Sequence, residues 1–262
     1  MQKRNFLQAT VISAVLGLGF VSAMPAANAT NLIPQREGEI ETTNLSCIVS
    51  AANCIRSSEL GFTVTSLEYQ DIDGNTYAPS RLFVDKGATE NNWGGGIRFG
   101  FTDLGTNTSK DEYWLRPVAY GTNDRVSEGG QLEVGRFRFD FGKKMAEIML
   151  ELFDIEDAFK TGIIKTDGIF KTNAVAQGGL LDQNGNNGIS SITLKNASYF
   201  ILQLGNRGRD SVFRSGDGVR LSGFALSRSV PEPSAAIGFG LLATAGTFGL
   251  KKRKKVSEEI GN

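Results

Sequence analysis

Oxygen-bearing side chains alternate along two short loops, and this spacing could bind a metal ion. The residues are Asp71, Asp73 and Asn75 in the first loop and Asp182, Asn184 and Asn186 in the second. Alternating carboxylate and amide oxygens in a tight loop suit Ca²⁺. Neither loop has the distal bidentate glutamate of a complete calcium loop. We therefore favour Asx turns between strands, and the sequence predicts no bound metal and no cofactor.

A second group that could do chemistry is the acidic run formed by Asp154, Glu156 and Asp157. Two facing carboxylates can hydrolyse a glycosidic bond without histidine. The chain contains no histidine, so the usual general base and the commonest zinc ligand are absent. We interpret the acidic run as a solvated turn and predict a protein that is not an enzyme. The alternative is a secreted polysaccharide-acting hydrolase that uses a carboxylate pair.

Aromatic side chains offer a third kind of chemistry, the binding of sugars. Trp93 lies in the glycine-rich stretch Asn91–Gly96, and Tyr113 and Trp114 follow further along the chain. Exposed rings present apolar faces on which a sugar ring can stack. We favour the interpretation in which both tryptophans belong to the core or to strand edges, so only weak affinity for extracellular polysaccharide is expected.

The two cysteines, Cys47 and Cys54, stand close together near the start of the central region. Disulfides persist in oxidising compartments and are rare in the cytosol. We predict a disulfide between them, with a pair of free buried thiols as the alternative. Metal binding by two thiols without imidazole is not expected.

The charge distribution argues against a nucleic-acid partner. Of 28 basic residues, Lys3, Arg4 and the cluster Lys251–Lys255 lie in the two ends, which leaves 21 in the central region. Of 28 acidic residues only Glu258 and Glu259 lie in those ends, which leaves 26. Binding to a phosphate backbone requires a concentrated basic surface, which an acidic central region does not indicate.

Short alternating runs, broken by Gly, Asn and Asp, predict that an antiparallel β-sheet structure positions these groups. In one run Ile97, Phe99 and Phe101 alternate with Arg98 and Gly100, and in another the phenylalanines of Phe137–Phe141 alternate with charged residues. Such spacing places the rings on one face of a sheet and the charges on the other. We predict an all-β, antiparallel β-sandwich of jelly-roll-like form. Further candidate strands are Phe62–Tyr69, Trp114–Tyr120, Ile189–Leu194, Tyr199–Leu204 and Val219–Leu226.

The run Met145–Phe153 fits both a helix and a strand. Met145, Ile148, Met149 and Leu152 share one helical face, whereas alternation of Ile148, Leu150 and Leu152 with glutamates fits a strand. We favour a strand that pairs with the Phe137 run as a hairpin.

The N-terminal segment has the features of a secretory signal peptide. Lys3 and Arg4 precede the apolar run Leu7–Val21, and Ala27-Asn28-Ala29 supplies the small-x-small site that signal peptidase accepts. This order predicts cleavage between Ala29 and Thr30 and export through the inner membrane. A retained N-terminal anchor is the alternative, but the apolar run is short and contains polar residues.

The C-terminal segment has three parts in a fixed order. Pro231, Glu232 and Pro233 lie in the motif at 230–234, the uncharged stretch 235–250 follows, and the basic cluster 251–255 ends it. Prolines hold the motif extended and remove backbone donors, which suits recognition by a protease. As a helix the uncharged stretch would be about 24 Å long, and snorkelling lysines can extend it across a bilayer. Clustered positive charge stays cytoplasmic, so the Pro-Glu-Pro motif faces outward.

This C-terminal arrangement resembles the PEP-CTERM sorting signal of exosortase substrates. The resemblance covers Val230–Lys255 and implies that Pro231, Glu232 and Pro233 are recognised by exosortase, which removes the tail. It implies export linked to extracellular polysaccharide or biofilm matrix. A single-pass anchored protein that is not processed is the alternative.

The stretch Leu132-Glu133-Val134-Gly135, continuing to Leu152-Phe153-Asp154, resembles the LEVG family of cyanobacterial exosortase targets. The role that this resemblance implies is surface display, and it supplies no catalytic residues.

Together these features predict the domain organisation. A signal peptide (1–29) precedes a β-sandwich ectodomain (30–229), a sorting signal with one transmembrane helix (230–255) and a cytoplasmic end (256–262). The expected partners are signal peptidase, exosortase, the inner membrane transiently, and extracellular polysaccharide. The protein is expected to be membrane-anchored before processing and at the cell surface or in the extracellular matrix afterwards.

Overall fold

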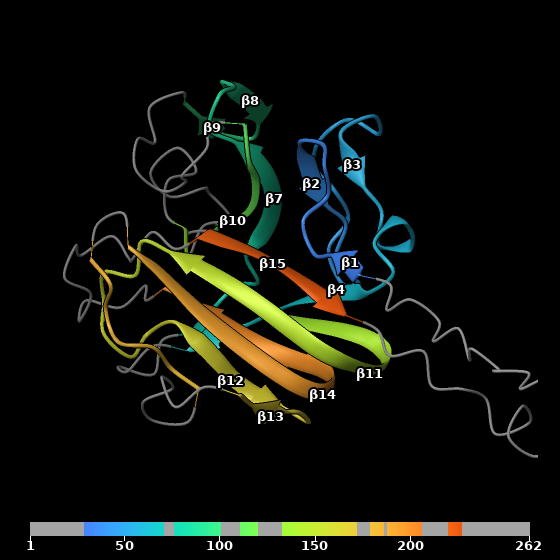
Figure 1. The fold of residues 1–262 in the computed structure, drawn as a ribbon. Helices are drawn as coiled ribbons and strands as arrows, with labels where there is room; N and C mark the ends of the chain where they lie inside the picture. Colours follow the sequence, from blue (N-terminus) through green and yellow to red (C-terminus); the bar gives the residue numbers. More distant parts are fainter. Residues whose placement is uncertain are drawn as a thin grey trace, which may run out of the picture.

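The computed structural model describes residues 29–70, 76–100, 111–119, 133–171, 179–185, 188–205 and 220–226. Within these ranges the chain forms β-strands and one 3₁₀ turn, η1 (Ser57–Glu59), so the all-β prediction is confirmed there (Figure 1). The strands are β1 (Ala29–Asn31), β2 (Gly38–Ile40), β3 (Cys54–Ile55), β4 (Thr63–Leu67), β5 (Tyr69–Gln70), β6 (Thr76–Tyr77), β7 (Arg81–Lys86), β8 (Asn91–Gly94), β9 (Ile97–Phe99), β10 (Tyr113–Val118), β11 (Gly135–Phe153), β12 (Gly162–Thr166), β13 (Ile169–Phe170), β14 (Ile189–Leu204) and β15 (Arg220–Leu226).

Eleven of these strands form one hydrogen-bonded sheet. Eight of the eleven follow the order β12-β14-β11-β15-β10-β7-β2-β3, and β1, β4 and β13 lie off this path. In addition β1 pairs with β15, β13 with β14 and β4 with β11, while β5-β6 and β8-β9 form small separate hairpins. All pairs are antiparallel except β2 with β3, which is parallel. The sheet is therefore mainly antiparallel, as predicted.

The long strands β11 and β14 run side by side and bend together, which gives the sheet two parts (Figure 1). Their register shifts between Asp140 and Met145, next to Gly142 at φ 65°. Residues 136–140 of β11 pair with β4, whereas residues 147–153 pair with β15. Since a bulge bends a strand and changes which side chains face inward, one ribbon of two strands contributes to both parts.

The side-chain alternation of β11 shows the effect of this bulge. Phe137, Phe139 and Phe141 are buried before it, at odd positions, and Ile148 and Leu150 are buried after it, at even positions. The predicted strand at Met145–Phe153 is confirmed, but the predicted hairpin with the Phe137 run is wrong. Both runs belong to β11 and pair with β14, because the glycine at 142 supports a bulge rather than a chain reversal.

The same correction applies to β14, where two predicted strands are one. Ile189–Leu194 and Tyr199–Leu204 join through Asn196, which adopts a positive φ of 55°. Asparagine tolerates this left-handed conformation better than most residues. The deviation therefore bends the strand opposite the β11 bulge without ending it.

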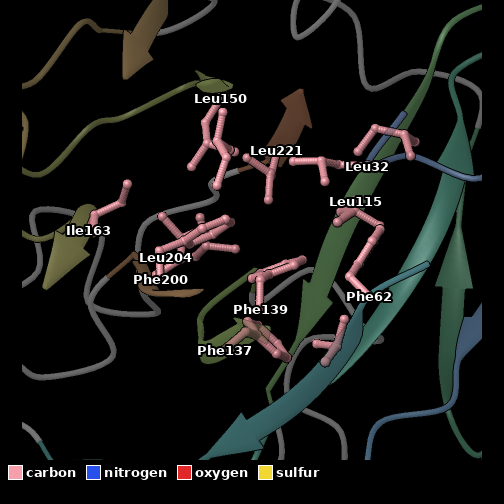
Figure 2. Packing of buried hydrophobic residues seen from close by; sticks show 14 of the residues in the cluster. Leu32, Phe62, Leu115, Phe137, Phe139, Leu150, Ile163, Phe200, Leu204 and Leu221 are labelled. Carbon is pink, nitrogen blue, oxygen red and sulfur yellow. The ribbon is translucent and has the colours of Figure 1, made fainter. Parts of the chain in front are cut away.

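A shared aromatic and aliphatic core lies between the two parts of the sheet, giving a sandwich-like arrangement (Figure 2). Phe139 of β11 stacks on Phe200 of β14 with ring centroids 4.8 Å apart, and Phe62 packs against Phe139 at 6.0 Å. From the other part, Leu115 and Leu221 join the same cluster. Burial of one such side chain contributes about 1.5–3 kcal/mol, so these contacts hold the bent sheet closed.

Several predicted features lie outside the described residues. They are the signal peptide up to residue 28, the motif Pro231-Glu232-Pro233, the helix at 235–250, and the loop residues Asp71, Asp73, Asn75 and Asn186. Among the helices of the described ranges, none has the length and apolar character needed to cross a bilayer.

Candidate functional site: an arginine–tyrosine sheet face

The disulfide predicted between Cys47 and Cys54 is present, with Cα atoms 5.8 Å apart. It closes the loop that leads into β3. Glu39 of β2 holds the same loop, because its carboxylate accepts a hydrogen bond from the Ile48 N–H at 2.6 Å and pairs with Arg81. The N-terminal strands are thus fixed by one covalent bridge and one buried carboxylate.

Residues 133–135 of the motif at 132–135 have a structural role. Glu133 is buried and pairs with Arg116 of β10. The Val134 carbonyl accepts a hydrogen bond from the Ser80 hydroxyl at 2.7 Å. At Gly135 a Cβ atom would overlap the Phe137 ring and meet the Ser80 Cβ at 3.0 Å. These residues anchor the start of β11 against β7 and β10.

A buried ionic cluster surrounds Arg116, which is fully buried. Its guanidinium pairs with Asp85 at 2.9 Å and with Glu133, and it lies 4.2 Å from the centroid of the Phe99 ring. Burial raises the pKa of the Asp85 carboxyl, and the Arg116 charge opposes that rise. Because a buried charge is costly without a partner, we interpret this cluster as structural.

The second loop proposed from the sequence lies beside the acidic run. The Asn184 side chain accepts a hydrogen bond from the Ile155 N–H at 2.8 Å, and the Asp154 N–H donates to the Gly188 carbonyl at 3.0 Å. The Asp182 carboxylate accepts from the adjacent Gln183 N–H at 2.9 Å. Among the described residues, no group of three or more acidic or cysteine side chains is arranged to hold a metal ion.

The acidic run itself differs from the solvated turn that we predicted. Asp157 is only 3% exposed, and Asp154 has a positive φ of 63°. Burial, followed by the charges of Asp154 and Asp157, raises the pKa of Glu156 to about 7. This turn is therefore partly buried and electrostatically strained.

The aromatic residues considered for sugar stacking do not share one surface. Trp114 is 1% exposed and lies in the core, as we favoured. Trp93 is half-buried against Phe83, with ring centroids 5.8 Å apart. The Lys86 Nζ lies over the Tyr113 ring, 5.5 Å from its centroid. Because Tyr113 and Trp114 are consecutive in β10, their side chains point to opposite faces.

A different aromatic and charged surface forms on the outward side of the first half of β11. We call it the arginine–tyrosine face, and it consists of Tyr69, Tyr77, Arg136, Arg138 and Tyr199. The two arginines alternate with inward phenylalanines, as the sequence predicted. Sequence reasoning missed the tyrosines, because β5, β6 and β14 bring them from distant parts of the chain.

The contacts within this face fix both guanidinium groups. Arg138 lies 3.8 Å from the Tyr199 ring centroid and donates to Asp140 at 2.6 Å. Arg136 lies 5.3 Å from the Tyr69 ring centroid and donates from Nε to the Gln203 amide oxygen at 2.8 Å. The hydrogen bond from Arg138 lowers the pKa of Asp140.

Further tyrosine packing and a neighbouring hollow complete this surface. The ring of Tyr69 stacks on Tyr77 with centroids 6.0 Å apart. A surface hollow of about 410 Å³, lined in part by Thr63, Asp140 and Phe141, adjoins the end of the face. The site therefore combines planar rings, oriented N–H donors and an open approach.

Over the described ranges, this fold and surface define a disulfide-containing, all-β structure with an outward cationic and aromatic sheet face. Comparison with protein-family models gave no match, and comparison with curated proteins gave no relative.

Two solved structures share a weak likeness, and both are catalytic domains of a GH87 alpha-1,3-glucanase in complex with tetrasaccharides. One has a TM-score of 0.22 and 11% identity, and the match covers 65% of this chain. The other has a TM-score of 0.23 and 9% identity, and the match covers 78% of this chain. The matches span 29% and 30% of those chains, respectively.

Proposed function

We propose that this chain is an exported, non-enzymatic surface or extracellular-matrix protein, sorted by an exosortase-type system. Its ectodomain would be a jelly-roll-like β-sandwich. Signal peptidase would cut between Ala29 and Thr30, and exosortase would recognise Pro231, Glu232 and Pro233. The inner membrane would hold the precursor transiently, and extracellular polysaccharide would be its partner after release.

The pairing of β1 with β15 is the observation that carries this proposal. Ala29, the first residue of β1, lies opposite Leu226, the last residue of β15 (Figure 1). The chain thus enters and leaves the ectodomain at the same end of the sheet. Four residues separate Leu226 from Pro231, a span of at most about 18 Å when extended. This arrangement suits a precursor that is held by both ends in one membrane.

The disulfide between Cys47 and Cys54 supports export independently of the two ends. Such bridges are typical of secreted proteins, since cytosolic thiols are kept reduced. A matrix protein also gains from the bridge, because it limits the freedom of the unfolded N-terminal strands.

Intact-mass measurement of the surface-released protein tests the proposal in a host that contains an exosortase. We expect loss of residues 1–29 and of all residues after the Pro-Glu-Pro region. A variant with Pro231→Ala, Glu232→Ala and Pro233→Ala should keep its tail and stay in the membrane fraction. The matched control is Ser234→Ala, which should be processed normally. Retention of Lys251–Lys255 in the released wild-type protein would refute the proposal.

A polysaccharide-acting hydrolase is the second candidate, and Glu156 is the observation that favours it. A carboxyl with a pKa of about 7 beside two other carboxyls is suited to general acid catalysis. Incubation of the purified protein with alpha-glucans, beta-glucans and polyuronates would test this activity through release of reducing ends. Release that Glu156→Gln abolishes would establish the enzyme; no release from any of them would leave the display function in place.

A further inference from the structure

The arginine–tyrosine face holds two cationic groups in register along one strand. Arg136 and Arg138 are two residues apart in β11, so their side chains leave the same face of the sheet about 6–7 Å apart. Their neighbours across the ladder face outward as well: Leu67 and Gln203 lie opposite Arg136, and Ile201 lies opposite Arg138. The result is a partly covered surface with a repeated positive group, on which the Arg138 side chain is 33% exposed and Gln203 is buried.

Each guanidinium is oriented before any ligand arrives. Arg138 stacks on Tyr199 and Arg136 lies over Tyr69, and each also donates one side-chain hydrogen bond. A planar guanidinium that is already stacked loses little conformational freedom when it binds an anion. These arginines therefore differ from flexible surface lysines.

Both arginines keep donors for a ligand. Within the described part of the chain, the Arg136 Nη groups and the Arg138 Nε and Nη1 groups have no acceptor. Asp140 neutralises only one of the two charges, and exposed Lys165 lies beside Ile201 in the same row as Arg138. The face is locally positive, although acidic residues exceed basic ones in the central region.

We propose that the arginine–tyrosine face binds a carboxylate-bearing polysaccharide, with Arg136 and Arg138 donating to carboxylates along the polymer. This inference rests on the proposed surface function and names its ligand class. A guanidinium fork matches a carboxylate in two parallel hydrogen bonds. The Tyr69 and Tyr199 rings cover one face of each guanidinium, so the polymer would be bound through the N–H groups in the guanidinium plane. A duplex nucleic acid fits less well, because its binding requires a concentrated basic surface, whereas this face has two arginines, one of them paired with Asp140.

Binding to sodium polygalacturonate, measured by titration calorimetry on the released protein, tests this proposal. Fully methyl-esterified polygalacturonate is the matched control ligand, since it keeps the sugar backbone but lacks the charges. We expect binding to the acid form only. Arg136→Gln and Arg138→Gln should each weaken it about tenfold, because each removes charge-assisted hydrogen bonds.

Two further variants separate a built site from simple charge attraction. Lys195→Gln removes one positive charge at an exposed position in the other half of β14, and it should leave affinity within about twofold. Arg138→Lys keeps the charge but loses the planar fork, and it should weaken binding nearly as much as Arg138→Gln. Unfolding midpoints measured for all variants exclude loss of fold as the cause.

Several results would overturn the proposal. They are no binding to polygalacturonate, equal binding to the esterified polymer, and equal weakening by Lys195→Gln. Full affinity of Arg138→Lys would reduce the site to non-specific charge attraction and would also overturn it. Binding is measured on protein that has already been released, so a negative binding result would overturn this inference and leave the sorting function, which the processing assay tests, untouched.

Discussion

Replacement of Arg116 by methionine tests whether the buried ionic cluster stabilises the fold. In the native protein Arg116 pairs with Asp85 at 2.9 Å and with Glu133, and the side-chain exposures are 0%, 3% and 2%. Methionine fills similar volume without charge, so two carboxylates would remain buried together without their cation. Removal of one partner from a buried ion pair costs about 3–5 kcal/mol. We expect a loss in that range at pH 7, a large fraction of a domain's total stability.

The stability loss of Arg116→Met should depend on pH, because the buried Asp85 carboxyl can take up a proton. Burial already raises the pKa of Asp85 in the native protein, and loss of the Arg116 charge should raise it further. A carboxyl whose pKa is higher in the folded than in the unfolded state takes up its proton more readily when folded. Stability of the variant should therefore fall as pH rises above about 4. The deficit relative to wild type should be smaller at about pH 5 than at pH 7.

Urea unfolding provides the measurement, with tryptophan fluorescence as the signal because Trp114 is buried two residues from Arg116. The matched control is Lys171→Met, which breaks the partly exposed ion pair with Glu147 and should change stability little. A loss below about 1 kcal/mol for Arg116→Met at pH 7, or a deficit that grows as pH falls, would refute the reasoning.

Three further predictions concern other parts of the chain. The double variant Cys47→Ala with Cys54→Ala should be about 2–3 kcal/mol less stable than the oxidised wild type, because the short closed loop no longer restricts the unfolded chain. The urea midpoints of the double variant with and without reductant should coincide. Glu156→Gln should stabilise the protein by about 1 kcal/mol above pH 7, where the wild-type carboxyl is ionised, after allowance for solvent screening. Below about pH 4.5 the wild-type carboxyl is protonated in both states, so the substitution should have no effect. Thermal melts across this pH range provide the measurement. Gly135→Ala should cost about 1–3 kcal/mol through overlap with Phe137, measured by urea unfolding, and a neutral effect would contradict the packing described here.

The fold class could be predicted because alternation is a local property. Phe137 and Phe139 point inward and Arg136 and Arg138 point outward for the reason that the sequence indicated, the two-residue period of a strand. The path of the strand could not be predicted in the same way. A bulge and a hairpin both interrupt alternation, and only the pairing with β14 distinguishes them.

The candidate functional residues also divide into those that the sequence predicted and those that only the structure revealed. The disulfide partners were evident, since the chain has only two cysteines. The burial of Trp114 was decided by packing, because an aromatic residue in a strand gives no sign of which face is covered. Tyr69, Tyr77 and Tyr199 were not chosen at all, since nothing in their local sequence connects them to the arginines of β11.

By itself the sequence determined the β class, the inward rings and outward arginines of the first half of β11, and the cysteine pair, and it predicted processing signals at the two ends. The tertiary structure alone decided that β1 begins beside the end of β15 and that Glu133 pairs with a buried arginine. It also decided that tyrosines from distant segments hold Arg136 and Arg138. The physical reason is that alternation and composition act over a few residues. Long-range pairing, by contrast, depends on which strands bury their shared apolar surface best.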